Sequence, residues 1–416
     1  MNLTKQNKQS ILLYGCTLLW VLLSFIASVI NTNHLSEEEY GDVRYVQNII
    51  QFMASLLLVG FFLSGSRLLA ITDNNSKRRE LRGAMIIILA VTAVLLMSGT
   101  AIAGIAHIDR PVLRSLFLVS VPVCFYPLLT NYINTTAQGD NHIGRLALTR
   151  VLPPLLYVIV SIPLFRTYGT TSAQMILLQW GLYSLILIAI VISTKPSFKH
   201  FGENFDMLRK ENRDYGIHLY IGSLAMVATT YIPGYTLGLF NETNAKVAYY
   251  TLALTLTQPL AYLPGIIGTT YFRQFARQSS IPRQVMRNTI IITSLSLVCF
   301  IFLIGFVVRL YKPGYEPVCG YARWMAAGFC IHGLGDMINR YMGSHGQGIA
   351  IRNSSFLCGG VKVAGYVLLV WLWDINGALL TTVLGSTAYF VSLLIYYLKY
   401  VRSGNSSLMT GDANPG

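Results

Sequence analysis

Long apolar runs alternate with short polar stretches along almost the whole chain. Each run is about 20 residues long, which is the length of helix that crosses ~30 Å of hydrocarbon. The pattern therefore predicts an all-α, polytopic membrane protein of about 12 transmembrane helices. The expected helices cover residues 10–30, 43–65, 83–106, 112–134, 146–165, 172–193, 216–240, 247–271, 289–310, 318–341, 354–372 and 376–398.

The composition agrees with this prediction. Hydrophobic residues make up 53% of the 416 residues and charged residues only 12%, whereas ordinary soluble domains carry about 25% charged residues. These values exclude a disordered chain, a collagen-like repeat and a cytosolic enzyme with a membrane tail. The six cysteines lie in or beside apolar runs without a C-x-x-C pair, so neither a disulfide framework nor a cysteine metal site is expected.

The basic residues indicate an orientation in the membrane. The net charge of +14 comes from 31 Lys and Arg against 17 Asp and Glu. With the N-terminus inside, 22 of the 31 fall in inside segments and 8 in outside segments. By the positive-inside rule this bias predicts two cytoplasmic termini, and it explains the charge without nucleic acid as a partner. The first apolar run, which follows Lys5 and Lys8, is expected to be an uncleaved helix and not a signal peptide.

The order of the expected helices suggests an internal duplication. Six helices precede a basic segment and six follow it, so the repeats would be parallel. Gln138-Gly139 after the fourth helix is echoed by Gln347-Gly348 after the tenth. The expected parts are an N-terminal lobe (1–193), a basic cytoplasmic linker (194–215), a C-terminal lobe (216–398) and a cytoplasmic tail (399–416). Because the connections are short, the chemistry is expected among the helices.

Several segments carry a resemblance to a known family. They are Tyr40-Gly41-Asp42 before the second helix, Ala248-Tyr249-Tyr250-Thr251-Leu252-Ala253 in the eighth, Leu310-Tyr311-Lys312-Pro313-Gly314-Tyr315 before the tenth and Gly346-Gln347-Gly348 after it. With them the chain resembles the multidrug/oligosaccharidyl-lipid/polysaccharide exporter superfamily. Within it, the chain is most similar to the bacterial polysaccharide (O-antigen type) flippases.

The resemblance implies a transporter and not an enzyme. Its substrate would be an undecaprenyl-pyrophosphate-linked oligosaccharide of O-antigen or lipopolysaccharide biosynthesis, carried from the inner to the outer leaflet of the bacterial inner membrane. Two six-helix lobes would alternate in access around a central cavity. Without an organic cofactor or a metal, transport would be coupled to H⁺ or Na⁺. A polysaccharide polymerase and a chain-length regulator are the expected protein partners.

Basic residues within or beside the expected helices are candidates for binding the pyrophosphate. Lys362 lies about nine residues into the eleventh helix, ~13 Å deep, and charge at that depth is costly. It could line a cavity, pair with a carboxylate, or reach an interface past small neighbours. Arg44 begins the second helix and Arg150 lies a turn into the fifth. At either position arginine could bind phosphate or serve as an interfacial anchor.

The tenth helix carries His332, Asp336 and Arg340 at intervals of four, which puts them on one stripe. Asp336 is the one acidic residue within an expected helix, so Asp336 or His332 is the candidate for ion coupling, with Arg340 near the substrate headgroup. The alternative is an ion pair between Asp336 and Arg340, with His332 a satisfied polar residue.

Prolines mark expected breaks in several helices. Pro233-Gly234 is expected to interrupt the seventh helix and to act as a hinge, and static kinked packing is the alternative. Further breaks are expected at Pro122, Pro127, Pro153, Pro154, Pro259 and Pro264.

Two other functions stay open. A drug or metabolite antiporter of the same superfamily would need a carboxylate-lined site for cations. A membrane-embedded glycan polymerase or acyltransferase is disfavoured because the expected outer loops are short. The sequence has no P-loop and no H-x-x-x-H or H-E-x-x-H pair, so ATP hydrolysis and a zinc site are not expected.

Overall fold

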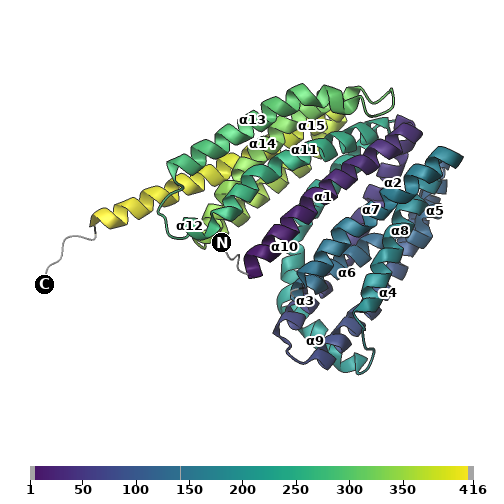
Figure 1. Cartoon of the computed structure of the whole chain (residues 1–416), viewed down its shortest axis with the longest axis horizontal. Coiled ribbons are helices and arrows are strands. Elements are labelled where there is room, and N and C mark those ends of the chain that lie inside the picture. Colours follow the sequence, from purple (N-terminus) through teal and green to yellow (C-terminus); the bar gives the residue numbers. More distant parts are fainter. Residues whose placement is uncertain (1–4, 141, 411–416) are drawn as a thin grey trace. The chain divides into compact units, whose positions relative to one another are not determined.

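The computed structural model describes residues 5–140 and 142–410, and within these ranges the chain forms helices and no strands (Figure 1). The predicted all-α, multi-pass fold is therefore confirmed. In the described ranges seven helices are long and apolar enough to cross a membrane, or eight if one bent pair counts as a single span.

The chain divides into two compact units. Unit 1 runs to Tyr231 and also includes Thr243–Ala248, and unit 2 comprises Ile232–Glu242 and the chain from Tyr249 onward. The lobe and linker boundaries expected from the sequence remain a prediction.

Unit 1 contains the first nine α-helices and part of the tenth. These are α1 (Lys5–His34), α2 (Glu37–Leu57), α3 (Phe61–Ile71), α4 (Asn75–Ala106), α5 (Pro111–Ser120), the 3₁₀ turn η1 (Val121–Val123), α6 (Tyr126–Gly139), α7 (Ile143–Tyr168), α8 (Ser172–Ser193), α9 (Phe201–Glu211), the π-turn η2 (Asn212–Gly216) and the start of α10 (Ile217–Phe240).

Unit 2 contains the end of α10, α11 from Tyr249 onward, and the later helices. These are α11 (Ala245–Thr270), α12 (Phe272–Phe275), α13 (Arg283–Val308), α14 (Pro317–Ser344) and α15 (Gly348–Thr410). The apolar core of this unit joins α14 to both arms of α15, and Figure 1 shows α13, α14 and α15 running alongside one another. The outer face of α13 exposes Leu295, Phe302 and Phe306, as expected of a helix that faces lipid.

Helix starts follow local sequence signals. Ser36 and Glu39 form a capping box at the start of α2, and Thr171 and Gln174 form another at the start of α8. Each box satisfies backbone N–H groups that have no partner within the helix.

The expected helix 43–65 is broken in the structure. Val59 and Gly60 have positive φ values of 42° and 80°, and α2 meets α3 at a bend of 57°. The Asn212 side chain holds the break, because its Nδ2 donates to the Val59 carbonyl (3.0 Å) and its Oδ1 accepts from Ser64 (3.1 Å). The prediction of one continuous helix was wrong. The residue that stabilises the break, Asn212, lies about 150 residues away in the chain, so the local sequence does not reveal it.

The last two expected helices form α15, which is kinked at Asp374 (φ 55°, ψ −134°). Asn241 donates to the Asp374 carboxylate at this kink (2.9 Å). Gly377 follows the kink, and a Cβ there would lie 1.9 Å from the Leu369 carbonyl oxygen. The turn therefore depends on the absence of a side chain at Gly377.

The proline predictions hold in part. The 3₁₀ turn η1 at Pro122 breaks the fourth expected span, and Pro127 opens α6. In contrast, α10 continues as a helix through Pro233 and Gly234, both buried, so the expected interruption there was wrong. The prolines within α7 and α11 likewise lie in continuous helices. The change from unit 1 to unit 2 nevertheless falls between Tyr231 and Ile232, directly before Pro233.

A buried carboxylate joins several helix ends in unit 1. The Asp140 side chain is fully buried after α6 and accepts from Arg78 (3.1 Å) and Arg82 (2.6 Å) of α4, and from Arg145 (3.1 Å) of α7. Arg82 also donates to the Thr194 carbonyl at the end of α8 (3.3 Å). This group is named the Asp140 cluster below.

Candidate functional site

One face of α2 carries a polar stripe through the interior of unit 1. Arg44, Gln47, Gln51 and Ser55 follow one another at intervals of three or four residues, which places them on one side of the helix. Such a stripe does not suit lipid contact, because unpaired polar groups in hydrocarbon cost several kcal/mol (about 2–7) each. The stripe is instead turned toward α6 and α8, as its partners below show.

Arg44 lies half-buried and is bonded only to neutral acceptors. Its Nε and one terminal nitrogen donate to the Tyr40 hydroxyl (2.8 and 2.6 Å), and the other terminal nitrogen donates to Gln47 (2.9 Å). Gln47 in turn donates to Gln179 of α8 (3.1 Å). Among the described residues no carboxylate forms an ion pair with Arg44.

The nearby acidic residues are occupied elsewhere. Glu39 accepts from Ser36 in the capping box, and Asp42 accepts from Asn244 (2.7 Å). Arg44 therefore presents a positive charge inside unit 1 that no anion of the described chain neutralises. A guanidinium in this state suits a phosphate group, to which it can donate two parallel hydrogen bonds.

Further along the same stripe lies a pocket of ≈ 200 Å³. It lies where two helices break, just before the α2–α3 bend and at the start of α6 after η1. Irregular backbone at membrane depth is tolerated where it lines a cavity, and transporters form their substrate sites at such discontinuous helices. The lining residues are Gln51, Ala54, Ser55, Leu58, Tyr126, Pro127, Thr130, Asn131, Asn134 and Tyr231.

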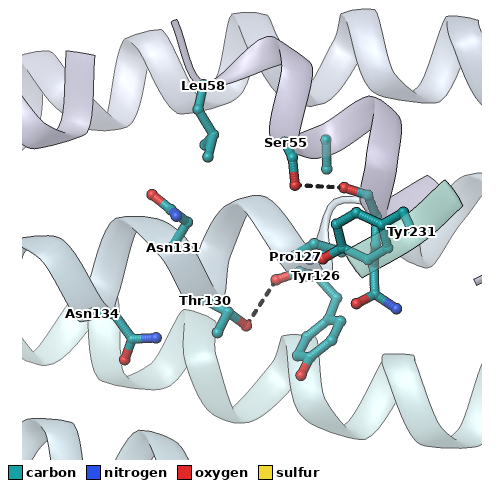
Figure 2. A pocket seen from close by; sticks show the side chains of 10 residues that line it. Ser55, Leu58, Tyr126, Pro127, Thr130, Asn131, Asn134 and Tyr231 are labelled. Atoms are coloured by element: carbon teal, nitrogen blue, oxygen red, sulfur yellow. Dashed lines mark hydrogen bonds between the residues drawn. The ribbon is translucent and has the colours of Figure 1, made fainter. Parts of the chain in front are cut away.

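Figure 2 shows Leu58, directly after α2, and Asn131 of α6 pointing toward one another across the pocket. The hydroxyls of Ser55 and Thr130 donate to backbone carbonyls one turn back, at Gln51 (2.8 Å) and Tyr126 (3.1 Å). Tyr126 packs edge-on against Tyr183 of α8, with ring centroids 5.2 Å apart. The pocket lining is therefore polar but carries no charge.

Unit 2 holds a second polar group, on α14 and α15. Tyr389 donates to the Asp336 carboxylate (3.1 Å) and accepts from Asn339 (2.6 Å), and its ring stacks on His332 with centroids 4.6 Å apart. The buried Nδ1 of His332 has no hydrogen-bond partner in the described chain. The i, i+4 ion pair between Asp336 and Arg340, one sequence alternative, is not formed.

Lys362 belongs to the same group. It is half-buried on the first arm of α15 and close enough to interact electrostatically with His332 and Asp336. Within the described ranges it makes neither a hydrogen bond nor an ion pair. Gly385 makes room for its chain, since a Cβ there would lie 2.4 Å from the Lys362 Cγ. The structure thus brings Lys362 of α15 close to Asp336 and His332, which lie on one face of α14.

The other predicted site residues lie apart from these groups. Arg150 is half-buried on α7 and donates to Thr17 of α1 (2.6 Å). Arg340 is exposed on α14, and its side chain passes over Gly268 of α11. Pro233 and Gly234 lie buried within α10. Their roles stay predictions.

Sequence reasoning missed the neutral residues of the site. Single amide side chains are common in apolar runs and do not by themselves indicate a site. The residues missed for this reason are Gln47, Gln51, Asn131 and Asn134. One signal was present, namely the recurrence of Arg44, Gln47, Gln51 and Ser55 at helical spacing. No sequence signal indicates that α6 and α10 complete the pocket.

Comparisons with known proteins identify the fold and a family. The family described as polysaccharide biosynthesis protein matches residues 7–277. The chain is similar to the solved lipid II flippase MurJ in an inward closed conformation, with a TM-score of 0.69 and 14% identity over 98% of this chain and 94% of that one. A comparison with curated protein sequences gives no match.

Two further solved structures are multidrug resistance MATE family transporters of the MOP superfamily. The inward-facing one has a TM-score of 0.65 and 15% identity over 94% of this chain and 96% of that one. The outward-facing one has a TM-score of 0.60 and 13% identity over the same shares. The chain therefore shares the fold of these transporters.

Proposed function

Because the chain belongs to the polysaccharide biosynthesis protein family, we propose that it is a flippase for a lipid-linked oligosaccharide. The proposed substrate is an undecaprenyl-pyrophosphate-linked repeat unit of O-antigen or a related polysaccharide. It would move from the cytoplasmic to the periplasmic leaflet of the bacterial inner membrane. The fold shared with a lipid II flippase supports a transport role.

The observation that carries the proposal is the un-neutralised charge of Arg44 on the polar stripe of α2. A pyrophosphate group would replace the neutral acceptors Tyr40 and Gln47 with anionic oxygens, which adds ion pairing to the hydrogen bonds and suits the bidentate geometry of a guanidinium. The prenyl tail would stay in the bilayer, so only the polar headgroup would need a path. Alternating access would then expose the headgroup on the other side.

The group around Asp336 is the proposed site of ion coupling. A carboxylate that accepts one tyrosine hydrogen bond and forms no ion pair can take up H⁺, or bind Na⁺ through oxygen ligands. Neutralising Asp336 would remove the negative charge near Lys362 and leave the positive charge of Lys362 uncompensated. Lys362 is also the second candidate for attracting the pyrophosphate.

The test uses spheroplasts and a membrane-impermeant enzyme that cleaves the lipid-linked oligosaccharide. Deleting the gene should abolish accessibility while the lipid-linked product accumulates inside. Arg44→Gln should lower accessibility at least tenfold at equal protein level, as expected for the loss of a charged hydrogen bond worth about 1.5–3 kcal/mol. The matched control is Arg166→Gln, on an exposed arginine at the end of α7.

Each other outcome points to a different function. Unchanged accessibility with altered chain length would favour a polymerase. No effect on glycan at all would favour the drug antiporter that the MATE-like fold also allows. Lys362→Ala and Asp336→Asn separate the two charged groups. Asp336→Asn should remove the dependence of translocation on an imposed H⁺ or Na⁺ gradient, whereas transport indifferent to both variants would exclude this group from the mechanism.

A further inference from the structure

The pocket at the α2 and α6 breaks is chemically different from the cationic part of the stripe. Its polar lining consists of amides and hydroxyls from α2, α6 and α10, and no Asp, Glu, Lys or Arg is among its lining residues. An anionic ligand would lose its hydration there without gaining an opposite charge, which is costly. The pocket therefore selects an uncharged, hydrogen-bonding group.

Two asparagines of α6, Asn131 and Asn134, line the pocket. A side-chain amide both donates and accepts hydrogen bonds, so it can bind a sugar hydroxyl or an acetamido group. Asn131, one turn before Asn134, points into the pocket (Figure 2).

The volume of the pocket and its aromatic side chain further restrict which ligand group can bind there. The volume of ≈ 200 Å³ is below the ~300–1,000 Å³ of pockets that hold drug-sized ligands, so one ring-sized group fits. Tyr231 contributes an aromatic ring that packs 6.4 Å from Phe52. Its apolar face can cover the C–H face of a pyranose while the amides bind the hydroxyl edge.

The register along α2 connects this pocket to Arg44. Gln51, at the pocket, lies seven residues after Arg44 on the same face, which is about 10 Å along the helix. Gln47 lies between them. A headgroup whose phosphates contact Arg44 can thus reach the pocket with the sugar units that follow.

We propose that this pocket is a subsite for one uncharged pyranose of the lipid-linked oligosaccharide, held by Asn131, Asn134 and Tyr231 while Arg44 binds the diphosphate. This inference rests on the proposed function, because it assumes a prenyl-diphosphate-linked glycan. It adds a sugar specificity: a neutral or N-acetylated ring is accepted at this position, and a uronic acid is disfavoured.

The test is binding to the full-length protein in lipid nanodiscs, measured by native mass spectrometry. The two probes are undecaprenyl diphosphate alone and undecaprenyl diphosphate carrying one N-acetylglucosamine. The wild-type protein should bind the sugar-bearing probe about tenfold more tightly, as two or three neutral hydrogen bonds allow. Asn131→Leu and Asn134→Leu should each lower the affinity for the sugar-bearing probe about three- to tenfold. Neither variant should lower the affinity for the probe without a sugar.

A matched threonine pair controls for folding. Thr130→Val and Thr92→Val each remove a hydroxyl that donates to the backbone carbonyl four residues earlier, but only Thr130 lines the pocket. Thr130→Val should lower affinity for the sugar-bearing probe alone, and Thr92→Val should change neither. Arg44→Gln should weaken both probes.

The outcomes separate this inference from the proposed function. If wild-type protein binds both probes equally, or the asparagine variants weaken both equally, the sugar subsite is wrong while a diphosphate site stands. If the wild-type protein binds neither probe, the proposed substrate itself is wrong. A third probe with glucuronic acid should bind no better than the sugarless lipid, and tight binding of it would contradict the neutral specificity.

Discussion

At the scale of single residues, two sets of half-buried arginines in unit 1 differ in their partners. Arg44 keeps its charge available because its partners are neutral. The arginines of the Asp140 cluster surround a fully buried carboxylate and are themselves 12–24% exposed. Arginine thus keeps an available charge at one place and joins helix ends at the other, and the number of acids within reach decides which.

We predict that Asp140→Asn strongly destabilises the protein. The change leaves three close arginines without their shared anion, and removing one partner of a buried ion pair costs about 3–5 kcal/mol. Thermal unfolding in detergent should show a clearly lowered midpoint. The control is Asp214→Asn, whose exposed pair with Arg213 is worth less than about 1 kcal/mol. Equal effects of the two variants would contradict a cohesive role for the cluster.

At the scale of elements, helix breaks are where the sequence was hardest to interpret. Runs of apolar residues identified the helices, and charges within them identified Arg44, Lys362 and Asp336 as candidates. The α2–α3 bend was not predictable, because the Asn212 side chain that holds it comes from a distant turn. The pocket was unpredictable for the same reason, since its walls meet only after three helices pack.

The α2–α3 break gives the second prediction. Gly60 has a φ of +80°, and a Cβ there would lie 2.6 Å from the Gly216 backbone. Gly60→Ala should therefore destabilise unit 1 by about 2 kcal/mol or more, from the left-handed conformation and the overlap together. Gly222→Ala is the control, because a Cβ there meets nothing within 4 Å. The measurement is the thermal unfolding midpoint of both variants. An unchanged midpoint for Gly60→Ala would mean that the backbone at the α2–α3 bend can shift to accommodate the added methyl group.

The turn in α15 gives the third prediction. Gly377→Ala would force the Leu369 carbonyl to move, so we expect a loss of about 1–3 kcal/mol and lower yield of folded protein. Gly360→Ala on the same helix has open space and should be neutral or slightly stabilising, by up to ~1 kcal/mol. Yield after size-exclusion chromatography and the unfolding midpoint are the measurements. Similar values for both variants would contradict the packing argument.

At the scale of the whole molecule, the orientation predicted from the basic residues can be tested directly. Tyr168→Cys lies in an expected outside loop and Lys199→Cys in the expected inside linker, and both positions are exposed. In spheroplasts, a membrane-impermeant maleimide should label Tyr168→Cys only, with the unsubstituted protein as the baseline. After lysis, both should be labelled. The opposite pattern would reverse the predicted orientation and place both termini outside.

The Asp140 cluster also has a consequence for biosynthesis. Arg82 precedes Asp140 by 58 residues, so at ~5–20 residues per second it leaves the ribosome about 3–12 s before its anion exists. During that interval Arg78 and Arg82 would act on membrane insertion at full charge in the orientation that the positive-inside rule predicts. Once Asp140 and Arg145 have been made, the same guanidinium groups bind the helix ends together. With the orientation predicted from the basic residues, the same atoms would act first on insertion and later on packing, and a mutation here would affect the nascent chain before the folded protein.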